Sequence, residues 1–225
     1  MGNSAKYLTS WRQHILTYRI PIFSQTERYI DFHGKGAELG AGTCWLASLL
    51  SKNPKVDHVS IFEIDSQRIK LARTHFCRLF GAVTGKIEFF NDDFHSLPFA
   101  DASLDFVVCD AALHHSDRIA DLLQEIHRIL KPNGVLLALR EPVLPSLQPL
   151  RTWKRLTFGW RERLLGDIEK TYTKQEWLRS FGTAQFHLSF YEYFLGTTLK
   201  ERIVRCLRKW NGLLFSRYFF IARPL

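Results

Sequence analysis

The stretch Gly36-Ala-Glu-Leu-Gly-Ala-Gly-Thr43 decides the fold expected for this chain. It predicts a strand that ends at Glu38 or Leu39, a tight turn at Gly40-Ala41-Gly42 and a helix from Thr43. Glycine suits the turn because it accepts backbone angles that other residues avoid and lets a ligand approach the main chain. An acid two positions before a Gly-x-Gly turn is also a nucleoside-binding signal, so the stretch predicts a ligand site at the turn.

Four further apolar runs of strand length follow this turn. The first, Val59-Ser-Ile-Phe-Glu63, ends in an acid 23 residues beyond Gly40, near the spacing at which a second-strand acid binds ribose hydroxyls. The others are Ile87 to Phe90, Asp105 to Asp110 and Val135 to Leu139. Strands that alternate with helices predict a parallel sheet covered on both faces.

Helices are predicted between these strands and at both ends of the chain. The predicted ranges are Ala5–Leu16, Gln25–Asp31, Cys44–Ser51, Ser66–Phe80, Asp117–Leu130, Lys174–Phe181 and Leu199–Trp210. Proline has no backbone N–H to continue a helix, so Pro21 predicts a break between the first two.

In this order, the motifs resemble those of the class I S-adenosylmethionine-dependent methyltransferases of the small-molecule type, over roughly Lys35 to Glu141. The stretch Leu130-Lys-Pro-Asn-Gly134 resembles the family's turn before strand five. The resemblance implies an α/β, Rossmann-like fold: a mostly parallel seven-stranded sheet with an antiparallel last strand and helices on both faces. Gln185–Tyr191 and Ser216–Ala222 would be the last two strands. The family usually has a third glycine where this chain has Cys44, which bears on the packing at the helix start.

The resemblance also implies how the chain is organised. Residues 1–34 would form N-terminal helices that cover the cofactor, and residues 35–141 would form the S-adenosylmethionine-binding core. Residues 142–225 would supply a substrate cap and the last two strands of the same domain.

S-adenosylmethionine is the cofactor that the resemblance implies. Glu63 would accept both ribose hydroxyls, although it could instead cap the next helix, with Asp65 and Ser66 as rival caps. Ile64 would lie against adenine, and Asp93 rather than Asp92 would accept from its amino group. Glu38 would orient the turn, and Asp110 or the Ala111 backbone would meet the ammonium. The cofactor-binding set is Glu38, Gly40, Ala41, Gly42, Glu63, Ile64, Asp93, Phe94, Asp110 and Ala111.

Four residues are candidates for a catalytic base. His114 and His115 follow the fourth strand, and histidine can take a proton near neutral pH, but in the resembled family such a pair more often shapes the pocket floor. Glu141 and Tyr172 would face the same crevice at the strand ends. The spacing of His and Cys gives no zinc site, and no metal is expected.

The composition of the chain limits the classes of protein to which it can belong. The chain has 225 residues, 46% of them hydrophobic, which suits a globular domain without a membrane span. Its four cysteines form no Cys-x-x-Cys pair and favour reduced thiols in a cytoplasmic protein. Residues 1–150 carry no net charge, whereas residues 151–225 carry all of the formal +9. That basic third is either a solvated surface or a site for an acidic substrate or an anionic membrane.

Three functions are consistent with these features. The first is methyl transfer to a small, lipidic or anionic metabolite by direct in-line attack. The second is an RNA methyltransferase, suggested by the basic last third, although no nucleic-acid-binding module is present. The third is a non-catalytic subunit that binds the cofactor and supports a partner.

Overall fold

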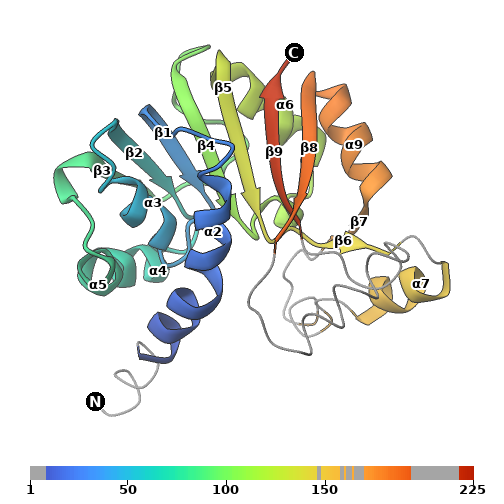
Figure 1. Cartoon of the computed structure of the whole chain (residues 1–225), viewed down its shortest axis with the longest axis horizontal. Helices are drawn as coiled ribbons and strands as arrows, with labels where there is room; N and C mark the ends of the chain where they lie inside the picture. Colours follow the sequence, from blue (N-terminus) through green and yellow to red (C-terminus); the bar gives the residue numbers. More distant parts are fainter. Residues whose placement is uncertain (1–8, 146–147, 158–159, 161–163, 165–169, 194–217) are drawn as a thin grey trace.

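The computed structural model describes residues 9–145, 148–157, 160, 164, 170–193 and 218–225. A seven-stranded sheet in the order β3-β2-β1-β4-β5-β9-β8 forms its centre (Figure 1). β9 pairs antiparallel with both β5 and β8, and the other pairs are parallel. The predicted fold class is therefore confirmed. The strands are β1 (Gly34–Leu39), β2 (Val56–Phe62), β3 (Ile87–Phe90), β4 (Leu104–Asp110), β5 (Leu130–Leu139), β8 (Phe186–Glu192) and β9 (Tyr218–Pro224).

Two apolar layers cover the two faces of this sheet, because successive strand residues point to opposite sides. On β4, Phe106 and Val108 join one core, and Val107 and Cys109 join the other. The first core contains α2 (Ile20–Thr26), α3 (Trp45–Leu50), η2 (Ala72–Phe76) and α5 (Cys77–Phe80). The second contains α6 (Ile119–Ile129) and α9 (Lys174–Thr183).

The central helices match the predicted ranges within a few residues. The range Ser66–Phe80 is helical throughout, as α4 (Ser66–Leu71), the π-helical turn η2 and α5. Two short 3-10 turns, η3 (Thr84–Lys86) and η4 (Leu113–His115), complete this part of the chain. The predicted turn Leu130-Lys-Pro-Asn-Gly134 falls within β5, where the register with β4 shifts.

The predicted break at Pro21 is wrong. The helix continues from the π-helical turn η1 (Ile15–Arg19) directly into α2 and ends at Thr26. Pro21 lies just after the π-helical turn, and such turns are a usual place for a helix to accommodate an interruption of its hydrogen-bond ladder. The second predicted helix, Gln25–Asp31, is therefore the end of α2 followed by a turn.

The last third adds a small second sheet that the sequence did not predict. β6 (Val143–Leu144) pairs with β7 (Tyr172–Thr173), and α7 (Gln148–Thr157) lies between them in the chain. The predicted helix Leu199–Trp210 lies outside the described residues. Among the described helices, none combines the length and the apolarity that crossing a membrane requires.

Figure 1 shows η1 and α2, drawn in blue, and α7, drawn in yellow, at the end of the sheet where β1, β4 and β5 finish. Apart from Tyr172, which lies in β7 of the second sheet, the predicted cofactor and catalytic residues lie at or after the ends of strands β1 to β5. This edge is where α/β sheets bind their ligands.

Candidate functional site

The turn after β1 has the backbone that the sequence predicted. Gly40 has a φ of 63° and Gly42 a φ of 53°, a region that favours glycine. A Cβ on Gly40 would lie 2.7 Å from the Cβ of Ala112, whereas a Cβ on Gly42 would meet nothing within 4 Å. The Ala41 N–H donates to the Phe62 carbonyl at 3.1 Å, which ties the turn to the end of β2. The turn therefore leaves open space beside Gly42, where a ligand can approach the main chain.

Glu38 holds the helix that follows the turn. Its side chain is fully buried, and Oε2 accepts a 2.7 Å hydrogen bond from the backbone N–H of Ala47 in the first turn of α3. A carboxylate at a helix N-terminus is favoured by the orphan N–H groups there. Burial raises the pKa of Glu38 well above its ordinary value of 4.5.

The raised pKa of Glu38 predicts a pH-dependent contribution to stability. Above pH 4.5 the unfolded chain releases this proton while the folded chain keeps it, so stability is lost as the pH rises toward the folded pKa. Replacing Glu38 with Gln keeps an acceptor for the Ala47 N–H and removes the titration. Urea unfolding from about pH 5 to pH 8 should show the free energy of unfolding of the wild type falling relative to that of Glu38→Gln. A constant difference across this range would contradict the prediction.

Glu63 connects the two loops after β1 and β2. Oε2 accepts from the Gly42 N–H at 2.7 Å, and Oε1 accepts from the Asp65 N–H at 3.0 Å. Asp65 caps α4 by accepting from the N–H groups of Gln67 and Arg68. The cap is therefore Asp65, and Glu63 is directed at the turn instead.

The loop after β3 completes this side of the site. Asn91, which the sequence reasoning missed, donates to the carbonyls of Glu63 and Ile64 at 3.0 and 2.8 Å. These bonds hold the loop that carries Ile64, whose apolar side chain lies next to Glu63 in the chain and is 73% exposed. The position of Asn91 directly after a strand was the available signal.

Asp92 and Asp93 have different neighbours. Asp92 accepts from the N–H of Asp93 at 2.8 Å, which makes it a turn residue. Asp93 accepts from the N–H of His95 at 2.9 Å with half of its side chain exposed. Phe94 is half-buried, and its ring lies 3.6 Å from the place of a Cβ on Gly40. The structure thus brings Phe94 to the turn, and the contact of Asp93 with adenine stays a prediction.

Asp110 lies in a cationic cluster that the sequence did not reveal. Oδ2 accepts from Arg19 Nη1 at 2.9 Å and from the Trp45 indole at 2.8 Å, and Oδ1 accepts from Arg140 Nε at 2.6 Å. The side chain of Asp110 is 4% exposed. Two guanidinium groups against one carboxylate leave the cluster with a net positive charge. The Asp110 oxygens already serve three donors, and the predicted contact of this carboxylate with an ammonium group stays a prediction.

The Glu141 side chain holds the loop after β4 in place through hydrogen bonds. Oε1 accepts from the N–H groups of Ala112 and Leu113 at 2.9 Å each, and Oε2 accepts from the N–H and the Nδ1 of His114 at 3.2 and 2.7 Å. The side chain has no exposed surface. The predicted role of Glu141 as a catalytic base therefore conflicts with its geometry, since all four contacts are structural and no oxygen reaches the crevice.

The other candidate bases differ in exposure. His114 is buried against Glu141, whereas His115 is exposed, with the ring centroids 4.2 Å apart. Tyr172 is half-buried on β7, and its ring packs at a tilt against Trp177 with the ring centroids 4.5 Å apart. Burial, assisted by Glu141 and Glu176, raises the pKa of Tyr172, so its hydroxyl stays protonated at neutral pH.

Three buried polar atoms around the start of α3 test whether a cofactor fits. Within the described residues, Glu38 Oε1, Thr43 Oγ1 and Arg19 Nε have no hydrogen-bond partner. Buried polar atoms are rarely left unsatisfied, so acceptors and donors on a ligand suit them. With the open space beside Gly42, the donor set fits a nucleoside cofactor that carries an amino acid. The described residues contain no group of three His, Cys, Asp or Glu side chains placed to hold a metal ion.

The fold and this turn define a Rossmann-like α/β protein with a nucleoside-binding edge. Comparisons with known proteins agree: residues 37–138 match the model of a methyltransferase domain family. The YcgJ protein of Bacillus subtilis has the same fold, with a TM-score of 0.67 at 18% identity over 92% of this chain and 99% of that chain.

Two curated relatives match at 30% identity. A fatty-acid O-methyltransferase of Mycolicibacterium smegmatis aligns over 121 residues, 53% of this chain and 42% of the relative. A demethylmenaquinone methyltransferase of Staphylococcus epidermidis aligns over 173 residues, 75% of this chain and 65% of the relative. The matched part of the chain thus spans less than two thirds of either relative. Residues 37–138 thus match a methyltransferase domain family, and the fold is the one that the YcgJ protein shares.

Proposed function

We propose that this chain transfers the methyl group of S-adenosylmethionine to a small, lipid-like acceptor. The observation that supports cofactor binding is the hydrogen bond that the Gly42 N–H donates to the Glu63 carboxylate. A carboxylate offers about four acceptor positions, and two are used by Gly42 and Asp65. Two positions remain for the two ribose hydroxyls, so the same side chain can hold the turn and the sugar.

The cationic cluster supports a place for the amino-acid part of the cofactor. The two positive charges of Arg19 and Arg140 exceed the single negative charge of Asp110, so the cluster favours binding the carboxylate of the cofactor. We propose two contacts for the ammonium group of the cofactor. One is the backbone of Ala111, which follows Asp110 in the chain, and the other is the unpartnered oxygen of Glu38, whose second oxygen is bonded to α3. Arg19 comes from the N-terminal helical segment, which supports the proposal that residues before 34 cover the cofactor.

The chain's own contribution to the reaction is mostly positioning. S-adenosylmethionine, when bound, supplies a methyl group activated on a sulfonium sulfur. The turn, Glu63 and the cluster hold both ends of the cofactor, and such alignment lowers the barrier by removing entropy that the encounter would otherwise lose. Of the four predicted bases, His115 has the exposed ring that an acceptor could reach, and we propose it for acceptors that lose a proton. The Glu141 carboxylate fixes His114 beneath it.

The acceptor class is suggested by an apolar stripe at the same edge. On α7, Trp153 and Leu156 lie three residues apart on one helix face and are 56% and 70% exposed. Trp160 and Leu164, which follow α7 in the chain, are 51% and 77% exposed, and we call these four side chains the apolar stripe. Residues 148–164 carry five Lys and Arg against one Glu, so the stripe lies within a basic segment. An apolar stripe in a basic segment suits an amphipathic, anionic lipid. The two curated relatives are named for a fatty acid and for demethylmenaquinone.

The test is a methyl-transfer assay that detects S-adenosylhomocysteine formation across four acceptors. We expect turnover with a long-chain fatty acid or a prenylated quinol, and little with a short carboxylic acid or with RNA. The double variant Trp153→Ala/Leu156→Ala should raise KM for the lipid acceptor about tenfold, the loss expected for two partly buried apolar contacts. Thr152→Ala, an exposed neighbour on α7, is the matched control and should leave KM unchanged.

Other outcomes decide against this proposal. Turnover on RNA with a steep dependence on salt would favour the RNA methyltransferase. Cofactor binding without transfer to any acceptor, restored by a protein from the same cell, would favour the non-catalytic subunit. An unchanged KM in the double variant would remove the stripe from the acceptor site.

A further inference from the structure

Two cysteines from separate helices meet beneath the cofactor turn. Cys44 Sγ lies 3.2 Å from Cys77 Sγ, and both side chains are buried. Cys44 is the N-cap of α3, with a φ of 47° in the left-handed region where the family usually has glycine. Cys77 opens α5. This contact brings two sulfur atoms, 33 residues apart in the chain, close enough to react.

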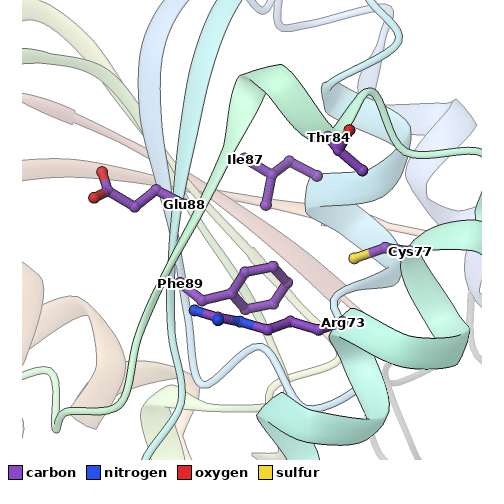
Figure 2. Close-up of a pocket in the computed structure, with 6 residues that line it drawn as sticks. All are labelled: Arg73, Cys77, Thr84, Ile87, Glu88 and Phe89. Atoms are coloured by element: carbon purple, nitrogen blue, oxygen red, sulfur yellow. The ribbon is translucent and has the colours of Figure 1, made fainter.

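A small oxidant can reach this pair from one side. Cys77 lines a pocket of about 440 Å³ between β3 and the helical segment that carries Arg73. Figure 2 shows the Cys77 sulfur directed toward the space bordered by Thr84, Ile87 and Phe89. Arg73 lies over the Phe89 ring, 4.9 Å from its centroid, so a cationic group borders the same space.

The environment gives the two thiols different roles. The hydrogen bond from Cys44 lowers the pKa of Cys77, and the charge of Arg73 acts in the same direction. The same contact, together with burial and the nearby Glu38, raises the pKa of Cys44. Because the thiolate is the nucleophile, Cys77 is the thiol that attacks first and Cys44 the thiol that resolves.

We propose that Cys44 and Cys77 form a redox-active dithiol site that a peroxide converts into an intramolecular disulfide. The Cys77 thiolate attacks one oxygen of hydrogen peroxide, the O–O bond breaks, hydroxide leaves, and a sulfenic acid forms. Cys44 then gives up its proton and its sulfur attacks the Cys77 sulfur, which breaks the S–O bond and releases water. Two thiols are oxidised, and one peroxide is reduced to two waters.

The disulfide would act on the cofactor turn, and this half of the inference rests on the proposed function. The Cys44 N–H donates to the Ala41 carbonyl at 2.8 Å, and the Cys44 carbonyl accepts from the Ser48 N–H at 3.0 Å. A disulfide has an S–S distance of about 2.0 Å, so the sulfurs must approach by about 1 Å. This movement displaces Cys44, the residue whose N–H closes the turn. We expect the oxidised protein to bind S-adenosylhomocysteine about three- to tenfold more weakly, because a close-packed interior transmits strain to its neighbours.

The chemical test is peptide mapping after treatment with a few equivalents of hydrogen peroxide, with and without later dithiothreitol. We expect a Cys44–Cys77 linked peptide that has lost two hydrogens and that dithiothreitol splits. Cys77→Ser should give no linked peptide. Cys109→Ser, which removes another buried thiol on β4, should give as much as the wild type. Sulfinate at Cys77 with Cys44 still a free thiol, or no change at either residue, would overturn the dithiol site.

Titration of S-adenosylhomocysteine into the reduced and oxidised forms separates the two proposals. A linked peptide with severalfold weaker binding supports both the site and its coupling to the turn. A linked peptide with equal binding in both forms overturns the coupling. A linked peptide with no binding in either form leaves the dithiol site standing and overturns the proposed function.

Discussion

Replacing Glu63 with Ala is expected to weaken the binding of S-adenosylhomocysteine by about ten- to a hundredfold. The substitution removes the acceptor for the Gly42 N–H and the two remaining acceptor positions proposed for ribose. Hydrogen bonds to a charged group contribute about 1.5–3 kcal/mol, and each 1.4 kcal/mol is tenfold in affinity. Calorimetric titration measures the change directly.

Two variants make the Glu63 result specific. Glu63→Gln keeps an acceptor for the Gly42 N–H but loses the charge, so its affinity should fall between the wild type and Glu63→Ala. Glu88→Ala removes an exposed acid from the neighbouring strand β3 and should bind like the wild type. Thermal unfolding of each variant shows whether the fold is kept. Unchanged affinity in a folded Glu63→Ala would refute the ribose assignment.

Replacing Glu141 with Ala is expected to have the largest effect on stability. Three backbone N–H groups and the His114 ring would lose their acceptor in a buried place. Removing one partner of a buried charged network costs about 3–5 kcal/mol. In a chain of this size, each kcal/mol lowers Tm by about 2–4 °C, so we expect a drop of about 6–20 °C by calorimetry.

The matched control for Glu141 is Glu192→Ala, since Glu192 is an exposed acid at the end of β8. Its Tm should stay within about 1 °C of the wild type, as is usual for surface changes. The opposite pattern would restore the catalytic interpretation. A Glu141→Ala protein with the wild-type Tm and normal cofactor affinity, but without methyl transfer, would make Glu141 the base after all.

The parts of the fold that could be predicted depend on patterns among residues close together in the chain. The Gly40–Gly42 turn and the second-strand acid Glu63 are encoded by adjacent residues, so their place at the sheet edge followed from the sequence. The cofactor residues remain predictions in their contacts, because the ligand itself defines those contacts. Pro21 misled because a helix can accommodate a proline beside a π-helical turn, and a sequence pattern does not show where such a turn lies.

The residues that were missed act through distant partners. Arg19 and Arg140 meet only at Asp110, from segments separated by most of the domain. The role of Glu141 likewise depends on a loop that starts 29 residues earlier. The tight contact of Cys44 with Cys77 has the same origin, since only the packing of α3 on α5 creates it. Spacing along the chain carries no signal for such pairs.

The place of β9 in the sheet has a consequence for folding during synthesis. β9 follows all the other strands that the structure describes in the chain, yet it lies between β5 and β8 in the sheet. Until residues 218–224 leave the ribosome, Leu136 to Leu139 of β5 present an unpaired apolar edge, and β8 has no strand to join. Exposed edges of this kind pair with other chains. The nascent protein is therefore more prone to aggregate, and more dependent on chaperones, before residues 218–224 emerge than after.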